Sequence, residues 1–378
     1  MPANGRTSLQ LTQQLVRLRS INPPGEERGC AELVGGLLEE AGYQVALYSY
    51  ADGRTSAVAK LAGSADEPPL CFTGHLDTVP LGAAAWSVDP LGAEIAGGLL
   101  YGRGSSDMKS GVAAMVLAAI AAAKLPGRKA GLILVITAGE ETGCDGARYL
   151  AGLQGVLPQA GAIVVGEPTS NYPLIGHKGA LWLRAAFRGV TAHGSMPEQG
   201  DNAVYKAARG TLRLSDHEFN APRHHHLGGP SLNVGTFSGG INVNSVPDRA
   251  EVQIDIRTVP GQSNEAICGE IGALLGEGAE LSRIVDVAAV ATSPQNDWVS
   301  GVFDIYERST GRRVDPRGAP YFTDASILAP AMGNIPALIL GPGESAMAHR
   351  TDEYCVVSRI EEAVELYADI ARQWMCGT

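Results

Sequence analysis

The pattern of apolar and polar residues has one style over roughly the first 177 residues. Short uninterrupted apolar runs, such as "PLCFTG", "GLILVITAG" and "AGAIVVGEP", alternate with helical patterns over residues 27–42 and 108–124. Continuous apolar strands that alternate with helices are typical of a largely parallel sheet covered by helices on both faces. This part of the sequence therefore predicts an α/β domain.

The pattern changes near residue 178 to strict alternation. In "ALWLRAAFRGV", Leu181, Leu183 and Phe187 fall on one face, and Trp182 and Arg184 on the other. Such alternation is typical of a sheet with one face in water. The strands and two helical stretches in this part follow the order β-α-β-β-α-β, which predicts a small ferredoxin-like α+β domain.

The apolar α/β style returns after about residue 293, with "IPALILGPG" and a closing helix over 358–375. Both ends of the chain therefore belong to one domain. We expect one α/β domain made of residues 1–177 and 293–378, and an inserted domain over 178–292.

Composition and charge exclude several classes of protein. The net charge of −11 gives no electrostatic support for binding nucleic acid or an anionic membrane. Six scattered cysteines without a C-x-x-C pair favour free thiols in a reducing compartment over disulfides or a cysteine zinc site. The apolar segment 111–124 is too short to span a bilayer. We therefore expect a cytoplasmic protein.

Candidate chemistry gathers where four apolar runs end. In open α/β sheets, ligands bind outside the carboxyl ends of the strands, so residues at these ends are expected to meet. A further acid, Asp107, stands at the start of the predicted helix 108–124. The residues that follow the four runs are His75 and Asp77, the pair Glu140 and Glu141, Glu167, and His349.

Histidine and carboxylate ligands without cysteine suit zinc, and also cobalt or manganese. Two adjacent glutamates repel each other unless positive charge lies nearby, and two metal ions supply it. One glutamate could bind metal while its neighbour remains free as a general base; spacing alone allows either order. Each residue also has a purely structural alternative. Glu140 and Glu141 could be solvated loop acids, and Asp107 could cap a helix. His75 could be a core histidine, although the nearby Asp77 favours an imidazole oriented to bind metal.

The run of histidines from His224 to His226 has two interpretations. It could chelate a metal ion, or it could be part of a polar loop between elements of the inserted domain. The polar loop is the better prediction, because a histidine run alone is weak evidence for a metal site.

Nine motifs occur in an order that resembles a family of metallo-deacylases and exopeptidases with two catalytic metal ions. This family includes acetylornithine deacetylase, succinyl-diaminopimelate desuccinylase, aminoacylase and glutamate carboxypeptidase. "LGPGESAMAHRTDEY" is most similar to the acetylornithine deacetylase branch, which implies a place in arginine biosynthesis. The motifs are "GHLDTVP", "YGRGSSDMKSG", "TAGEETG", "GEPT", "HKGALW", "TAHGSMPEQGDNAV", "NSVPD", "DIRTVPG" and "AHRTDEY".

The resemblance implies a role for each residue of the strand-end set. His75 and Glu167 would bind one metal ion, Glu141 and His349 the other, and Asp107 would bridge both. Asp77 would orient His75. A water molecule shared by two zinc ions, or by cobalt or manganese, would attack the carbonyl of an N-acyl amino acid, with Glu140 as general base.

The resemblance also implies roles in and around the inserted domain. This domain would act as a lid and form a homodimer, and His193 would reach the partner's site to stabilise the oxyanion. Asn244 and Arg257 would bind the substrate carboxylate, although they could equally be polar residues of the sheet's wet face. Arg350 could add positive charge near the substrate or face solvent.

Other functions remain open at this stage. A desuccinylase or a glutamate-type carboxypeptidase or dipeptidase would use the same residues, and a non-catalytic relative could only bind small ligands. A nucleotide-binding oxidoreductase is rejected, because "GPGESA" fits G-x-G-x-x-A but no helix is predicted directly after it.

Overall fold

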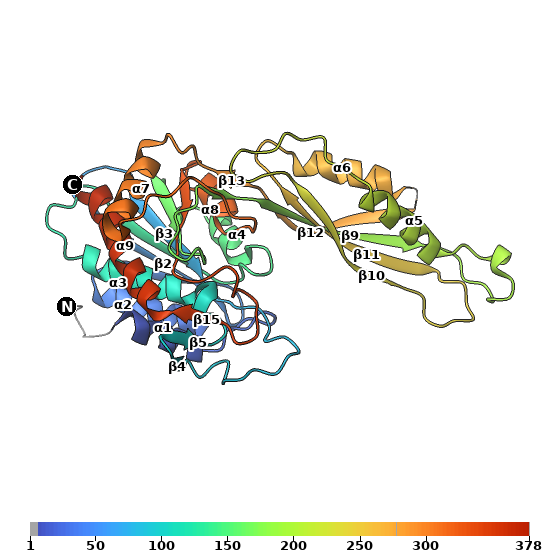
Figure 1. Ribbon diagram of the computed structural model, residues 1–378, viewed down its shortest axis with the longest axis horizontal. Coiled ribbons are helices and arrows are strands. Elements are labelled where there is room, and N and C mark those ends of the chain that lie inside the picture. Colours follow the sequence, from blue (N-terminus) through green and yellow to red (C-terminus); the bar gives the residue numbers. More distant parts are fainter. Residues whose placement is uncertain (1–6, 277, 378) are drawn as a thin grey trace. The chain divides into compact units, whose positions relative to one another are not determined.

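The computed structural model describes residues 7–276 and 278–377, and the chain divides into two compact units (Figure 1). Unit 1 consists of Met1–Gly176, Ala291–Arg317 and Thr323–Thr378, and unit 2 of His177–Val290 and Gly318–Phe322. The sequence pattern placed the limits of the insertion at 178 and 292 and gave no sign of the short second segment.

Unit 1 is built on a six-stranded sheet whose parallel strands are buried. β6, β3, β7 and β14 run parallel, β2 runs antiparallel to β6, and β1 runs antiparallel to β2. The predicted largely parallel α/β sheet is thus confirmed. Across the sheet the strands are β1 (Gln44–Ala51), β2 (Arg54–Leu61), β6 (Leu132–Thr137), β3 (Leu70–His75), β7 (Ala162–Val165) and β14 (Ala337–Ile339).

Helices cover both faces of this sheet (Figure 1). α2, α3 and α9 pack on one face, and α4 and α8 on the other. α3 is apolar on all sides and buried over most of its length, because α1, α2 and α9 pack around it. The helices of unit 1 are α1 (Ser8–Arg17), α2 (Arg28–Glu40), α3 (Ser110–Ala122), α4 (Asp145–Gly152), α7 (Asp297–Thr310), α8 (Ala325–Ala331) and α9 (Val357–Cys376).

A small separate sheet ties two distant segments of unit 1 together. The run "GLLYG" does not join the main sheet; it forms β5 (Leu99–Tyr101), which pairs with β4 (Ile95–Ala96) and β15 (Tyr354–Val356). β15 thereby brings the chain that follows His349 beside the chain that precedes Asp107.

β8 (Gly176–His177) and β13 (Val290–Ala291) form another two-stranded sheet.

Unit 2 has the β-α-β-β-α-β order and one four-stranded antiparallel sheet, as predicted. Its sheet order is β10-β11-β9-β12, and α5 and α6 lie on one face of the sheet (Figure 1). Leu181, Leu183 and Phe187 are buried towards the helices. The elements are β9 (Gly179–Arg188), α5 (Ala203–Ser215), β10 (Ser231–Gly239), β11 (Arg249–Thr258), α6 (Asn264–Leu275) and β12 (Ala279–Val287).

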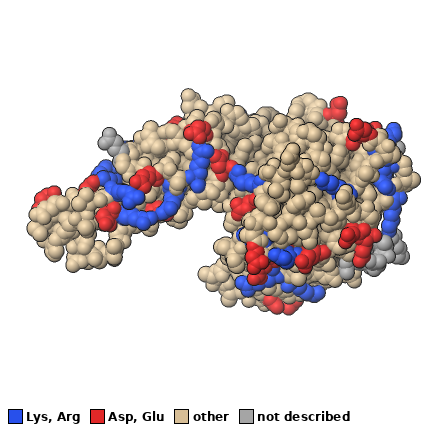
Figure 2. Space-filling model, turned by 180° about the vertical axis from the view of Figure 1, so that it is seen from behind, with Lys and Arg blue, Asp and Glu red and all other residues tan. Residues whose placement is uncertain are grey.

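The surface mixes both signs of charge. Figure 2 shows basic and acidic side chains next to one another, separated by wide uncharged areas, on the face that it presents. Within the described residues, no helix has the length and apolar character needed to cross a bilayer.

Candidate metal centre

Three neighbouring parallel strands of unit 1 end at the same edge of the sheet. β6, β3 and β7 are adjacent, and the carboxyl ends of parallel strands point the same way. His75 is the last residue of β3, Glu140 and Glu141 follow β6, and Glu167 follows β7. The strand order therefore gathers one histidine and three carboxylates at this edge.

The imidazole of His75 is buried and oriented by Asp77. Its Nδ1 lies 2.9 Å from the carbonyl oxygen of Asp77 and 3.5 Å from Asp77 Oδ1. Both oxygens are acceptors, so in the neutral ring Nδ1 carries the proton and Nε2 is free to bind metal. Nε2 lies 3.2 Å from Asp107 Oδ1 and 3.7 Å from Glu167 Oε1, which directs it into the carboxylate cluster.

Asp107 precedes α3 instead of capping it. α3 begins at Ser110, its N-cap is Lys109 without a side-chain cap, and Asp107 has non-helical angles of φ −119° and ψ 96°. The predicted helix 108–124 is therefore present but begins two residues later, and the helix-cap alternative for Asp107 is wrong. Asp107 Oδ1 faces His75, and its Oδ2 lies 3.5 Å from His349 Nε2, so one carboxylate spans two histidines.

The adjacent glutamates sit on a tight turn held by Asp77. Gly139 has φ +76°, and a Cβ there would lie 2.4 Å from the hydroxyl oxygen of Tyr50, so the turn requires glycine. The backbone amide of Glu140 donates to Asp77 Oδ1 at 3.1 Å, and that of Glu141 to Oδ2 at 3.2 Å. Glu141 Oε2 then lies 3.1 Å from His349 Nε2.

Burial among like charges raises the pKa of all three glutamates. Burial and the neighbouring Glu167 hold the pKa of Glu140 well above its usual range, and burial and Asp107 do the same for Glu167. Burial and Asp107 also raise the pKa of Glu141. For Asp107, burial is outweighed by hydrogen bonds with the two histidines, which lower its pKa. The cluster thus holds more carboxylates than its histidines can balance.

The two histidines of the cluster have raised pKa values. Hydrogen bonds with Asp107 and Glu141 raise the pKa of His349 to about 10. Burial alone would lower the pKa of His75, but its bonds with Asp107 and Asp77 hold it well above the usual range. A metal ion would take the place of these protons, because metal binds the unprotonated imidazole.

Ligand atoms converge in two overlapping groups. His75, Asp107 and Glu141 form one, and His75, Glu140 and Glu167 form the other; within each, the ligand atoms lie within 4.8 Å of one another. The strand-end residues of unit 1 thus come together as the sequence predicted. Because each glutamate of the adjacent pair belongs to one group, these distances alone do not assign which of the two binds metal.

Comparison with known proteins identifies the family. Residues 71–373 match the sequence profile of "Peptidase family M20/M25/M40", a range that includes the whole cluster. The chain belongs to this family. The resemblance stated from the motifs is therefore confirmed, and this M20 protein is a metal-dependent hydrolase.

Relatives of this M20 chain carry two different names. A probable succinyl-diaminopimelate desuccinylase from Staphylococcus epidermidis is 29% identical, over 97% of this chain and 97% of the relative. An acetylornithine deacetylase from Aliivibrio fischeri is 28% identical, over 95% of this chain and 96% of the relative. The identities are nearly equal, so they do not choose a substrate.

A solved structure shows the same fold. The M20 family metallo-carboxypeptidase Sso-CP2 from Sulfolobus solfataricus matches with a TM-score of 0.83, over 98% of this chain and 99% of that chain. The two sequences are only 18% identical, so the comparison confirms the architecture and nothing finer.

His193 and Asn244, predicted from M20 motifs, lie in unit 2 and are exposed. His193 Nδ1 accepts a hydrogen bond from the backbone amide of Ser195 at 3.2 Å and lies 2.7 Å from the Ser195 hydroxyl oxygen. The carbonyl oxygen of Asn244 accepts from the amide of Gly194 at 2.7 Å. Backbone contacts thus link the two loops that carry His193 and Asn244.

Arg257 of unit 2 is partly buried on β11. Its Nε lies 2.9 Å from Asp255 Oδ1. The guanidinium carbon lies 5.9 Å from the ring centre of Trp182 and 5.8 Å from that of Phe322. Two aromatic rings and one carboxylate therefore hold this cation in place.

Two other predicted positions are less constrained. Arg350 is exposed in unit 1, directly after His349, and its guanidinium has no hydrogen bond or ion pair within the described part of the chain. The rings of His225 and His226 lie 4.6 Å apart, but neither ligand group found among the described residues includes the run His224–His226. The polar-loop interpretation of that run remains the better one.

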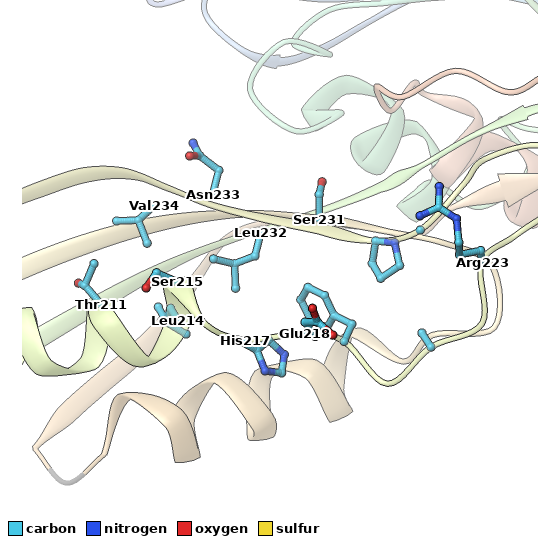
Figure 3. Close-up of a pocket in the computed structure, with 14 residues that line it drawn as sticks. Thr211, Leu214, Ser215, His217, Glu218, Arg223, Ser231, Leu232, Asn233 and Val234 are labelled. Atoms are coloured by element: carbon cyan, nitrogen blue, oxygen red, sulfur yellow. The ribbon is translucent and has the colours of Figure 1, made fainter.

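A separate pocket of unit 2 lies between the end of α5, residues 216–230 and β10 (Figure 3). Leu232 and Val234 point from β10 towards α5, whereas Ser231 and Asn233 point away (Figure 3). None of the predicted site residues lines this pocket. This pocket is therefore not part of the candidate site.

Sequence reasoning missed several polar residues buried around the cluster. Asn22 Nδ2 donates to Asp77 Oδ2 at 2.8 Å, and Asp324 accepts from the Thr137 hydroxyl at 2.5 Å. Burial raises the pKa of Asp324 to about 6. Glu353 was inside a recognised motif, "AHRTDEY", but its role was not predicted. Its distance in sequence from its partners left no local signal.

Proposed function

We propose that this M20 protein hydrolyses the amide bond of a small N-acyl amino acid, with acetylornithine deacetylase-like specificity. The observation that carries the proposal is the cluster in which Asp107 lies within 3.5 Å of both the buried His75 and the partly exposed His349. A carboxylate between two histidines, with three further glutamates, is suited to two divalent metal ions.

The residues present fit such ions. The donor set is histidine and carboxylate, without cysteine, which suits zinc and also cobalt or manganese. Glu141 Oε1 is buried and has no hydrogen-bond partner among residues 7–276 and 278–377, so an acceptor is available inside the cluster. Buried acceptors without partners are costly, and a cation would satisfy this one.

We assign His75 and Glu167 to one ion, Glu141 and His349 to the other, and Asp107 to both. The 3.1 Å separation of Glu141 Oε2 and His349 Nε2 supports their sharing an ion. When bound, the two ions would polarise the substrate carbonyl and lower the pKa of a water molecule.

Glu140 is our candidate for the general base. Burial and the charge of Glu167 raise its pKa, which makes its carboxylate a stronger base than an exposed glutamate. It would accept the proton of the attacking water and pass it to the leaving amine. Asp77 would keep this geometry, because it orients His75 and holds the amides of Glu140 and Glu141.

His193 is suited to stabilise the oxyanion. Because the Ser195 amide donates to Nδ1, the neutral ring carries its proton on Nε2, which can then donate to a negative oxygen. Asn244 and Arg257 would bind the substrate carboxylate, for which a planar guanidinium is well shaped. Arg350 would add a positive group beside His349.

We further propose a homodimer formed through unit 2, in which His193 serves the partner's site. Unit 2 exposes several large apolar side chains on α5 and on the loop after β10, which could contribute to an interface. Tyr205 and Leu212 on α5 are 63% and 66% exposed, and Ile241 and Val243 are 94% and 101% exposed. Burial of these residues against a second copy would remove apolar surface from water.

The test is hydrolysis by chelator-stripped and by zinc- or cobalt-reloaded protein. We expect release of free amine from N-acetylornithine only after reloading. Unchanged activity after complete stripping would contradict the metal mechanism. Absence of hydrolysis of every N-acyl amino acid by metal-loaded protein would instead favour a ligand-binding role.

A second candidate is succinyl-diaminopimelate desuccinylase activity, favoured by the 29% identity to a relative of that name. A panel with acetyl, succinyl and dipeptide substrates separates the candidates. The highest kcat/KM on the succinyl substrate would replace the acetylornithine assignment and leave the metal mechanism intact.

A further inference from the structure

Glu353 is a fully buried carboxylate four residues after His349. Its Oε2 accepts from Arg103 Nη1 at 2.6 Å and from the amide of Gly104 at 3.1 Å. Its Oε1 accepts from the amides of Ser106 and Asp107, at 2.8 and 3.0 Å. One side chain thus binds three backbone amides of the segment that ends at Asp107.

These amides depend on Glu353 because their segment is irregular. Gly104 has φ +88°, and Asp107 and Met108 have non-helical angles, so the segment continues neither β5 nor α3. Buried amides outside regular structure need an acceptor from elsewhere. A carboxylate suits this task, because its two oxygens accept several hydrogen bonds without offering a donor.

Further bonds fix the chain around Glu353 to the same segment. The Ser106 hydroxyl donates to the carbonyl oxygen of Tyr354 at 2.8 Å and accepts from the amide of Glu344 at 2.9 Å. The amide of Gly102 donates to the carbonyl oxygen of Glu353 at 2.9 Å. The segment before Asp107 and the chain on both sides of His349 therefore form one connected unit.

Arg103 balances the charge of this buried carboxylate. Its guanidinium is also buried, donates to the carbonyl oxygen of Pro80 at 3.1 Å, and lies 5.2 Å from the ring centre of Trp86. A buried carboxylate is tolerated when an opposite charge and hydrogen bonds compensate it. The pair therefore gives Asp107 a support with little freedom to move.

We propose that Glu353 is a positioning residue that fixes the Asp107 carboxylate between the two metal positions by holding the Asp107 backbone amide. The proposal rests on the proposed dinuclear function. It adds that the relative positions of Asp107 and His349 are set by Glu353, not by the ligands alone. Residues that orient metal ligands typically change metal affinity by about 10–100-fold when they are replaced.

The experiment is calorimetric titration of chelator-stripped Glu353→Gln and wild-type protein with Zn²⁺. The amide keeps the size but turns a donor towards at least one backbone N–H. We expect about 10–100-fold weaker binding of at least one ion and a lower kcat with little change in KM. Thermal unfolding of the stripped proteins records the structural effect separately.

Glu27→Gln is the matched control. Glu27 is also fully buried and accepts from Arg54 Nε at 2.9 Å, but in the described part of the chain its side chain has no hydrogen bond with the backbone of a proposed ligand residue. We expect its replacement to lower the unfolding temperature of the stripped protein and to leave both zinc affinities unchanged. Equal zinc affinities in Glu353→Gln and wild type would overturn the proposal, as would an equal loss of affinity in Glu27→Gln.

Glu353→Asp covers the case in which the glutamine variant does not fold. It keeps the charge and shortens the reach, so we expect weaker zinc binding than wild type; wild-type affinity would contradict the positioning role. Failure of the underlying function looks different, because wild-type protein itself would then bind fewer than two zinc ions.

Discussion

The two units place their candidate residues in opposite environments. In unit 1, His75, Asp77 and Glu167 are almost completely buried and lie against other ionisable groups. In unit 2, His193 and Asn244 are exposed; His193 contacts Ser195, and Asn244 contacts Gly194. Unit 1 thus brings most of the proposed metal ligands together, whereas His193 and Asn244 of unit 2 are not gathered with other candidate residues.

The difference follows from the two kinds of sheet. The central parallel strands of unit 1 are buried on both faces, and charged or histidine side chains appear only at or after their carboxyl ends. The antiparallel sheet of unit 2 has helices on one face only, so most alternate side chains of β9 and β11 are partly exposed, and those of β11 are polar. A polar residue is therefore strong evidence of function in unit 1 and weak evidence in unit 2.

The largest effect should come from Glu140→Ala in unit 1. Loss of a general base costs about 10²–10⁴-fold in turnover, and we expect the upper end because burial makes Glu140 a strong base. Metal content should remain close to wild type. Activity and bound metal, measured on the same sample by amine release and elemental analysis, check both expectations.

Glu141→Ala is the matched control, because it removes the neighbouring carboxylate. We expect it to lose metal. Glu141 Oε2 lies 3.1 Å from His349 Nε2, and Glu141 Oε1 is buried without a hydrogen-bond partner among the described residues. If Glu140→Ala loses metal and Glu141→Ala keeps it, the roles of the two glutamates must be exchanged.

His193→Ala tests whether unit 2 contributes to chemistry. We expect kcat to fall by about 10²–10³-fold, the scale for losing one donor to the oxyanion. If His193 acts in the partner's site, heterodimers of Glu140→Ala and His193→Ala subunits, purified through a different affinity tag on each subunit, should have one intact site of two and about half of the wild-type activity.

The heterodimer experiment also distinguishes the case in which His193 acts in the active site of its own chain. If His193 served its own chain, each site of the mixed dimer would lack one residue and no activity would return. Co-expressed wild-type subunits carrying the same two affinity tags provide the reference activity. An unchanged kcat in His193→Ala would remove unit 2 from the chemistry altogether.

Much of unit 1 could be predicted from sequence because its signals are local. Apolar runs locate β3, β6 and β7, and strand order then brings their ends together. The start of α3 was misplaced because Asp107 and Met108 have non-helical backbone angles although the helical pattern of the sequence continues through them. The ion pair between Arg103 and Glu353 joins residues from opposite ends of the chain, so no local pattern reveals it.

The topology of unit 2 was also predictable, because alternation marks each strand. Its short second segment, Gly318–Phe322, could not be predicted, because five residues are too few to show a hydrophobic periodicity. The roles of His193, Asn244 and Arg257 came from motif resemblance and remain predictions. Their environments explain this, because an exposed position tolerates many different polar side chains, whereas a buried position tolerates few.

A third prediction compares buried histidines in the two units. His75 has a raised pKa because carboxylates surround it, whereas burial lowers the pKa of His177 in unit 2 to about 4. His177 Nδ1 lies 2.8 Å from the carbonyl oxygen of Lys178, and Nε2 has no hydrogen-bond partner among the described residues.

The sign of the effect follows from the lowered pKa. Between pH 6.5 and 4, the unfolded chain binds a proton at this histidine and the folded chain does not, so stability falls as pH falls. The difference between 6.5 and about 4 corresponds to about 3 kcal/mol. His177→Phe should therefore lose less stability than wild type between pH 7 and 4 in urea unfolding. Identical losses would contradict this assignment.

The smallest expected effect is that of Tyr205→Ser on the exposed face of α5. Tyr205 is 63% exposed, so its loss should change the free energy of unfolding by no more than about 0.5 kcal/mol. If α5 forms the dimer interface, burial of each ring contributes about 1.5 kcal/mol or more, and the dissociation constant of the dimer should rise at least about tenfold for each of the two rings lost. Sedimentation over a range of concentrations measures the dissociation constant.

Tyr149→Ser in unit 1 is the matched control, because Tyr149 is 36% exposed on α4 and packs near Tyr50. We expect it to leave dimerisation unchanged. A dimer weakened by Tyr149→Ser and not by Tyr205→Ser would place the interface on unit 1. His193 would then have no route to a partner's site, and the exposed apolar residues of unit 2 would need another explanation.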